Sequence, residues 1–268
     1  MDRRLTPATE RVAHVSLKGQ IEAPAWTEGD KLRVQTNIID LLRAPNGPRE
    51  RQLVLGDAFT VIDRVGDHAF GFAVKDGYCG WLPEIALADG PEPTHWVASV
   101  GTHRYDEPRV QKAQFAVPTG AKVRLSGFDG KWAKVNLGYM PASHLRAIGD
   151  WFSDPVEVAE WFLRTPYLWG GNSRAGMDCS GLMQIAFAAC GVALPADSDL
   201  QISVGTEVAG PLKRGDLIFW KGHVALIVGD GRILHANGFT MSVAYEGLDA
   251  AIERIAVAEG PVLARRRL

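Results

Sequence analysis

The chain has 268 residues, with 29 basic and 31 acidic side chains and a formal net charge of −2. Its Lys and Arg residues do not cluster, apart from Arg265–Arg267, so we expect no nucleic-acid partner. The longest strongly apolar run covers residues 224–228, far short of the ~20 residues of a spanning helix, so no membrane partner is expected. At ~100–200 residues per domain, the length predicts two or three domains.

The cysteine count indicates a compartment. Cys79, Cys179 and Cys190 are an odd set that cannot form a disulfide framework. The charged residues at the N-terminus are not followed by an apolar stretch, so we expect no secretory signal. A reducing cytoplasm is therefore the predicted location.

The first 150 residues contain short strand-like runs separated by Gly and Asp, including 59–62, 70–74 and 132–135. Residues 80–83 read Gly-Trp-Leu-Pro and residues 138–141 read Gly-Tyr-Met-Pro, and each run is followed at the same distance by a leucine. Such an echo is typical of tandem modules. We predict an N-terminal segment (1–29) and two small β-barrels (30–90 and 91–149).

Residues 150–268 have α+β character. Asp154 is a predicted helix cap followed by Pro155, and this helix should run to about Arg164. A second helix is predicted from Cys179 to Cys190, with Gly191 as its C-terminal stop. Strands are predicted at 216–220, 223–228 and 232–236.

Cys179 is the candidate nucleophile. At the start of a helix, the backbone N–H groups and the dipole favour the thiolate. On position alone, a cysteine there is more often structural, and Cys79 and Cys190 are interpreted as packing residues.

A nucleophile needs a base and an orienting group, and two histidines are candidates for these roles. If Gly229–Gly231 forms a three-residue loop, His223 and His235 are diagonal neighbours on one face of a hairpin, ~7–8 Å apart between Cα atoms. A two-residue loop would place them on opposite faces. Each histidine alone would more simply start or cap a strand.

The C-terminal half resembles NlpC-type peptidases, which are papain-like enzymes that cleave cell-wall stem peptides. The segments that carry the resemblance, in order, are Pro166–Gly171, Asp178–Leu182, Leu194–Gln201, Arg214–Phe219, Gly222–Val224 and His235–Ala236. With bacterial SH3-like modules before it, the chain looks like the γ-D-glutamyl-L-diamino-acid endopeptidase branch. The resemblance implies an α+β fold of two SH3-like barrels followed by a papain-like catalytic domain.

The resemblance also implies catalytic roles. Cys179 would attack the amide carbonyl, and His223 would act as its base and then protonate the leaving amine. His235 would orient His223, with Asn237 as the alternative. The Cys179 N–H and the Tyr167 hydroxyl would stabilise the oxyanion; Tyr167 alternatively packs as an aromatic.

The implied substrate is a peptidoglycan-derived peptide, L-Ala-γ-D-Glu-diamino acid, with a free N-terminus. Asp197 would bind the ammonium group. The implied lining residues are Ser198, Ser180, Asp178, Trp169, Asp57 and Tyr78. Asp57 stands where the branch usually has Glu, which favours a bridging water, and it alternatively serves as a turn aspartate. No cofactor or metal is expected.

Two other functions stay open from sequence. Cys179, His223, His235 and Asp178 could ligate zinc in a metallohydrolase, although no tight ligand pair is present. The chain could also be a wall-peptide-binding module without catalysis, which the complete Cys-His-His set argues against.

Overall fold

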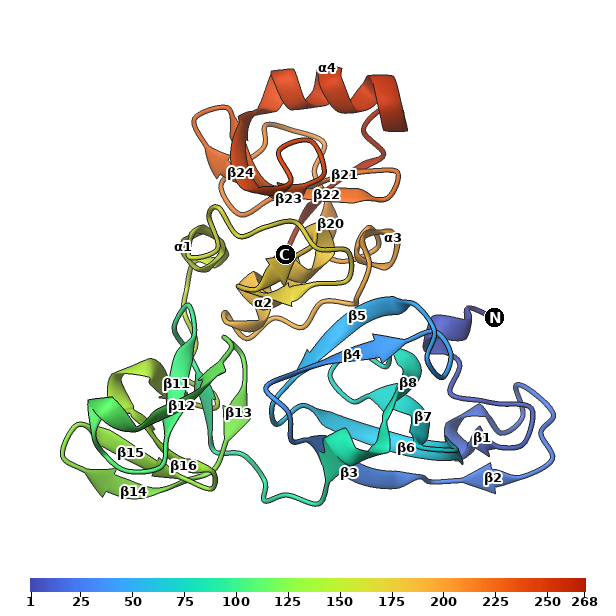
Figure 1. Cartoon of the computed structure of the whole chain (residues 1–268). Coiled ribbons are helices and arrows are strands. Elements are labelled where there is room, and N and C mark those ends of the chain that lie inside the picture. Colours follow the sequence, from blue (N-terminus) through green and yellow to red (C-terminus); the bar gives the residue numbers. More distant parts are fainter. The chain divides into compact units, whose positions relative to one another are not determined.

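The computed structural model describes residues 1–268 and divides into two compact units, Met1–Ile148 and Gly149–Leu268 (Figure 1). The first unit is built from β-strands and short 3-10 helices, and the second combines helices with a sheet. The α+β prediction is confirmed. None of the helices has the length and apolar character needed to cross a bilayer.

Seven strands of the first unit form one antiparallel sheet, which we call the first β module. In order across the sheet they are β5 (Arg49–Val54), β4 (Ile38–Leu42), β8 (Cys79–Pro83), β7 (His68–Ala73), β6 (Ala58–Val65), β3 (Asp30–Val34) and β9 (Leu87–Ala88). The N-terminal segment adds a small parallel pair, β1 (Ala13–His14) and β2 (Trp26–Thr27). Arg11 and Thr9 tie this segment to the module through the Asp63 carboxylate at 2.6 and 2.7 Å.

The second β module has two smaller sheets. One orders β13 (Lys122–Val123), β10 (His95–Val97) and β17 (Leu145–Ala147). The other orders β12 (Ala113–Val117), β11 (Thr102–Tyr105), β16 (Gly138–Pro141), β15 (Trp132–Val135) and β14 (Leu125–Asp129).

The runs at residues 80–83 and 138–141, which are similar in sequence, also have the same backbone structure. Pro83 ends its strand with φ −58° and ψ 126°, and Pro141 ends the equivalent strand with φ −57° and ψ 125°. A 3-10 helix follows in each case, at Glu84–Ala86 and Ala142–His144, and each leads into a short strand that starts with leucine. The repeated run in the sequence therefore folds into the same strand, 3-10 helix and strand in both places, and the division into two domains stays a prediction.

The corner between β5 and β6 locks the two modules together. Leu55 of the first module is buried in a cluster with Val97 and Met140 of the second. The Lys122 N–H donates to the Leu55 carbonyl at 2.8 Å. Gly56 has φ +79°, and a Cβ there would lie 2.2 Å from the Lys122 carbonyl oxygen. This close approach explains why residues 1–148 form one unit.

A six-stranded sheet is the centre of the second unit. Its order is β20 (Thr206–Glu207), β25 (Ala264–Arg267), β21 (Leu217–Trp220), β22 (His223–Gly229), β23 (Arg232–Asn237) and β24 (Ser242–Gly247). Helix α2 (Cys179–Ala188) packs against β22 and β23, and α4 (Leu248–Glu259) lies on the other side of these strands (Figure 1). Ala251 and Ile255 of α4 pack on Ile218, Ala225 and Ile233 of the sheet.

The smaller elements of this unit are α1 (Pro155–Glu160), β18 (Asn172–Ser173), β19 (Gly176–Met177) and α3 (Ser198–Gln201). Helix α1 starts as predicted, because Asp154 accepts the Val156 N–H at 2.9 Å and Pro155 follows it. It ends earlier than the predicted Arg164. Turns with i→i+3 hydrogen bonds replace the helix after Glu160, and Arg164 adopts φ +68°.

Helix α2 begins at Cys179, as predicted, and ends at Ala188 rather than Cys190. The Cys190 N–H bonds to the Phe187 carbonyl, three residues back, so the last turn tightens. Gly191 then takes φ +78°, the left-handed conformation expected of a C-terminal stop.

Candidate active site

Cys179 is the first residue of α2. Asp178 caps this helix by accepting the Gly181 N–H at 2.6 Å, which fixes the direction in which the helix begins. The Cys179 side chain is buried, and its Sγ lies 4.0 Å from the carbonyl oxygen of Gly222, the residue that precedes β22. The start of the helix and the start of the strand therefore meet at the sulfur.

Burial controls the charge of this thiol. It raises the pKa of Cys179 to about 12, and the nearby Asp178 charge acts in the same direction. The backbone N–H groups of Val224, Ser180 and Cys179 act in the opposite direction. The helix start was expected to favour the thiolate; its N–H groups do so, but burial outweighs them, and the thiol is neutral in the free protein.

The two histidines contact each other directly. His223 Nε2 lies 2.9 Å from His235 Nδ1, and His235 is completely buried. Burial, with a smaller contribution from His235, lowers the pKa of His223 to about 3. Burial also lowers the pKa of His235 to about 4, against the opposing charge of Glu246. Both rings are neutral at pH 7.

The hairpin between β22 and β23 reaches the required register by a route that differs from the prediction. Gly229 pairs with Arg232, so the loop is a two-residue turn of Asp230 and Gly231, with φ of +51° and +64°. The three-residue loop was wrong. A bulge between Ile227 and Gly229 adds the missing residue and restores the odd register. The histidines therefore share one face, although the turn alone would have separated them.

Asn237 was the alternative orienting residue, and the structure gives it another contact. Its Oδ1 accepts the Thr240 N–H at 2.8 Å and the Thr240 hydroxyl at 3.1 Å. His235, rather than Asn237, lies against His223.

Two residues behind His235 were missed by the sequence analysis. Glu246 Oε2 lies 3.1 Å from His235 Nε2, and Arg254 of α4 binds both Glu246 oxygens at 2.8 and 2.7 Å. A signal for α4 was present, because Leu248, Ala251, Ile252 and Ile255 repeat at helical spacing.

Tyr167 is partly buried in the segment that precedes α2. Burial raises the pKa of Tyr167 above its usual range, and the charges of Cys179 and Asp178 add to the shift. The phenol therefore stays protonated and able to donate a hydrogen bond. Trp169 is 69% exposed on the same segment.

Asp178 and Ser180 are engaged with the chain itself. The Asp178 carboxylate accepts the Gly181 N–H, the Ser180 hydroxyl at 3.0 Å and the Gly170 N–H at 2.9 Å. Burial raises the pKa of Asp178 although these bonds oppose the shift, and the charge of Asp197 contributes to the increase.

Asp197 and Ser198 stand at the start of α3. Asp197 has φ +60° and ψ 139°, a conformation that favours glycine, and its side chain does not cap the helix. Gln201 is fully buried and donates to the carbonyls of Ser180 and Pro195 at 3.1 and 2.9 Å. These bonds hold the Asp197 loop against the start of α2.

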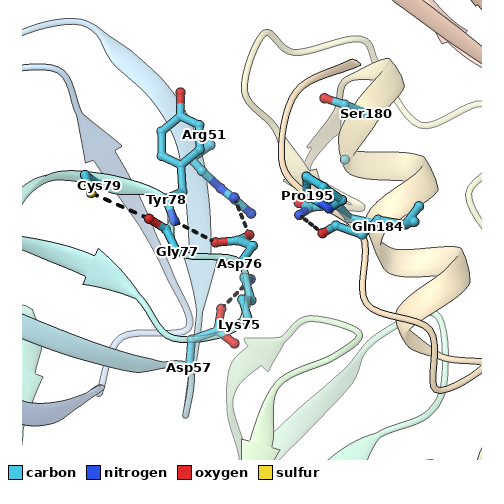
Figure 2. Close-up of polar contacts among 12 residues, drawn as sticks. Arg51, Asp57, Lys75, Asp76, Gly77, Tyr78, Cys79, Ser180, Gln184 and Pro195 are labelled. Carbon is cyan, nitrogen blue, oxygen red and sulfur yellow. Dashed lines mark hydrogen bonds and ion pairs between the residues drawn. The ribbon is translucent and has the colours of Figure 1, made fainter. Parts of the chain in front are cut away.

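Asp57 and Tyr78 belong to the first unit. Both Asp57 oxygens are paired, one with Lys75 and one with Lys122, at 2.7 Å each. Asp57 also accepts the Val54 N–H at 3.1 Å, as the turn-aspartate alternative requires. Tyr78 is 2% exposed, and its backbone N–H donates to Asp76 at 3.2 Å (Figure 2).

Arg51 joins the Tyr78 neighbourhood from β5. Its guanidinium pairs with Asp76 and lies 5.3 Å from the centre of the Tyr78 ring (Figure 2). Arg51 and Asp76 are both buried in this pair. Tyr78 is thus part of a buried ion-pair cluster in the first β module.

The zinc alternative has no ligand set in this geometry. His223 Nε2 and His235 Nδ1 face each other instead of a shared point. The structure contains no group of three or more His, Cys, Asp or Glu side chains placed to hold a metal ion.

Comparison with known proteins agrees with this architecture. Residues 164–254 match the NlpC/P60 family, and residues 41–87 match the bacterial dipeptidyl-peptidase Sh3 domain. The γ-D-glutamyl-L-lysine dipeptidyl-peptidase of Bacillus cereus is 28% identical over 274 residues, covering 82% of each chain. The enzyme of the same name from Bacillus subtilis is 42% identical over 92 residues, covering 31% of each.

A solved NlpC/P60 family protein from Bacillus cereus has the same fold. Its TM-score is 0.79 at 23% identity, over 89% of this chain and 99% of that one. Residues 164–254 are therefore an NlpC/P60 cysteine peptidase domain, and residues 41–87 are a bacterial dipeptidyl-peptidase SH3 domain.

Proposed function

We propose that this peptidase hydrolyses the bond between γ-D-Glu and the diamino acid in peptidoglycan stem peptides that have a free N-terminal L-Ala. The observation that carries the proposal is the meeting of Cys179 with the start of β22, where His223 contacts His235 at 2.9 Å. The substrate follows the names of the two Bacillus relatives, one of which aligns along 82% of this chain.

The reaction starts from a neutral pair. His223 takes the Cys179 proton as the sulfur attacks the amide carbonyl, and the resulting imidazolium protonates the leaving amine of the diamino acid. The peptide carbonyl is then held as a thioester, which water hydrolyses with His223 again as base. Neutral starting forms fit this order, because burial disfavours the separate ions before the substrate arrives.

The tetrahedral oxygen needs donors. We assign the Cys179 N–H at the start of α2 and the Tyr167 hydroxyl to this role. The phenol supports the assignment because its pKa is raised, so it donates a proton to a hydrogen bond instead of carrying a charge. Removing one such donor costs about 10²–10³-fold in kcat.

Asp197 is the proposed ligand of the L-Ala ammonium group. A non-glycine residue in its conformation costs about 1–3 kcal/mol, and such strain concentrates at functional sites. The buried Gln201 contacts hold the loop rigidly in place, which supports a binding role. Ser198, Ser180 and Trp169 are proposed to line the neighbouring D-Glu site.

We also place this activity in the reducing cytoplasm, on imported wall peptides. All three cysteines are free, as this location requires.

The test compares free and N-acetylated L-Ala-γ-D-Glu-L-Lys, following release of L-Ala-γ-D-Glu. We expect kcat/KM to be about 10–100-fold higher for the free peptide, the value of one charge-assisted hydrogen bond. Asp197→Asn should erase this preference, whereas the exposed neighbour Asp199→Asn should keep it. Equal cleavage of both peptides by the unmodified protein would refute the ammonium site, and full activity in Cys179→Ala would refute the mechanism.

A further inference from the structure

The side chains of His223, His235 and Glu246 form a diagonal line across three adjacent strands. Ala244 pairs with His235 in the β23–β24 ladder, so Glu246 is the diagonal neighbour of His235, two residues along β24. His223 stands in the same diagonal relation to His235 one strand earlier. The line ends at Arg254, which approaches from α4.

Two neutral histidines that share one hydrogen bond have two possible arrangements of protons. In the first, His223 Nε2–H donates to His235 Nδ1, and His223 Nδ1 is left with a free lone pair. In the second, His235 Nδ1–H donates to His223 Nε2, and the His223 proton lies on Nδ1. Because His223 Nε2 is occupied by His235, Nδ1 is the nitrogen left to act as a base, and only the first arrangement leaves it unprotonated.

We propose that Glu246, held by Arg254, is a positioning residue that keeps His235 in the tautomer protonated on Nε2 and so keeps His223 Nδ1 free to act as the base. This inference rests on the proposed function for its catalytic meaning. The carboxylate oxygen lies 3.1 Å from His235 Nε2, and an ionised carboxylate accepts hydrogen bonds but cannot donate one. A proton on His235 Nε2 is attracted by this carboxylate, whereas a lone pair in the same place is repelled by its negative charge, so the carboxylate favours the first arrangement.

Arg254 keeps Glu246 in the acceptor form. Its guanidinium forms a two-point contact with the carboxylate and lowers the pKa of Glu246, mainly through these hydrogen bonds. The guanidinium also lies 4.5 Å from the centre of the Phe239 ring, which holds it from a second side. Arg254 and Glu246 are only partly exposed, and His235 between Glu246 and His223 is fully buried.

Glu246→Gln tests the inference, because glutamine has only one acceptor. A neutral amide cannot accept from both Arg254 N–H groups as the carboxylate does. With the amide oxygen on Arg254 Nε, the NH₂ takes the place of Oε2 and faces His235 Nε2, so the proton of His235 moves to Nδ1. His223 is then protonated on Nδ1, the nitrogen that must act as the base because Nε2 is occupied by His235. We expect kcat for the Lys tripeptide to fall about 10²–10⁴-fold with KM within about 3-fold, as in other enzymes whose histidine tautomer is inverted.

A second variant separates this role from a structural one. In Glu246→Gln/Arg254→Met, no arginine competes for the amide oxygen of the glutamine. This oxygen can therefore accept a hydrogen bond from His235 Nε2–H. We expect this double variant to be at least 10-fold faster than Glu246→Gln, although it has lost more contacts. The matched control is Glu253→Gln, an exposed neighbour on α4, with unchanged rate. A double variant slower than the single one would overturn the proposal.

Two readouts need no substrate. ¹⁵N NMR of the imidazole rings should show His235 protonated on Nε2 in the unmodified protein and on Nδ1 in Glu246→Gln. Alkylation of Cys179 by iodoacetamide at pH 7 should slow in Glu246→Gln and recover in the double variant. If His235 keeps its proton on Nε2 in Glu246→Gln, the inference is overturned. If the tautomers shift as expected but the unmodified protein does not cleave the tripeptide, only the proposed function is overturned.

Discussion

Asp57→Asn removes the charge at the junction of the two β modules. Burial alone would raise the pKa of Asp57, but the charges of Lys122 and Lys75 hold it well below its usual range. The carboxylate is 1% exposed and lies 2.7 Å from each ammonium nitrogen. The substitution leaves two lysines close together without a counter-charge, while asparagine can still accept the Val54 N–H.

The expected loss of stability follows from these contacts. Breaking a buried ion pair from one side costs about 3–5 kcal/mol, but the two lysine side chains are 30% and 34% exposed and can turn to solvent. We therefore expect about 2–3 kcal/mol, or about 5–10 °C in the melting temperature of a unit of this size. Differential scanning calorimetry of the full chain measures it, with Asp30→Asn as the control, because the Asp30–Arg64 pair is exposed.

The same variant separates the two interpretations of Asp57. A structural role predicts a lower melting temperature with KM for the stem tripeptide within about 3-fold. Adding Lys122→Met should recover part of the loss, since it removes one of the uncompensated charges. A change below about 0.5 kcal/mol, combined with a raised KM, would refute this reasoning and return Asp57 to the substrate site.

Three further predictions follow from the geometry. In the folded protein the pKa values of His223 and His235 are lowered to about 3 and 4, so below pH 6.5 the unfolded chain binds more protons than the folded one. Lowering the pH from 7.5 to 5 should therefore reduce the free energy of unfolding by about 2 kcal/mol per histidine. Equal melting temperatures at pH 5 and pH 7.5 would contradict this. Gly56→Ala should lower the free energy of unfolding in urea by about 3 kcal/mol or more, because the new Cβ would lie 2.2 Å from the Lys122 carbonyl oxygen. The control is Gly19→Ala, which has a similar φ but open space around the Cβ and should lower it by about 1 kcal/mol. EDTA should leave tripeptide cleavage unchanged, and activity that is lost and then restored by zinc would support a metal route instead.

Local signals predicted much of the fold. The cap at Asp154, the helix start at Cys179 and the repeated Gly-aromatic-apolar-Pro run each depend on neighbours in sequence, and each is present in the structure. Helix ends were less predictable, because the last turn can tighten into i→i+3 bonds at little cost.

The site was harder to predict where it depends on distant partners. The hairpin register was right only because a bulge compensates for a shorter turn, and no sequence pattern distinguishes that arrangement from a plain three-residue loop. The two lysine partners of Asp57 could not be predicted from the sequence, because one of them comes from the other module. Glu246 and Arg254 gain their importance only when β24 and α4 are placed beside His235.

The position of Leu55 affects the nascent chain during synthesis on the ribosome. A ribosome releases Leu55 before any strand of the second module exists, yet Leu55 completes that module's core. The nascent first module therefore carries an uncovered leucine until residues 95–147 have emerged. Chains stalled near residue 90 should be the synthesis intermediates that chaperones bind most strongly, because their apolar corner has no partner yet.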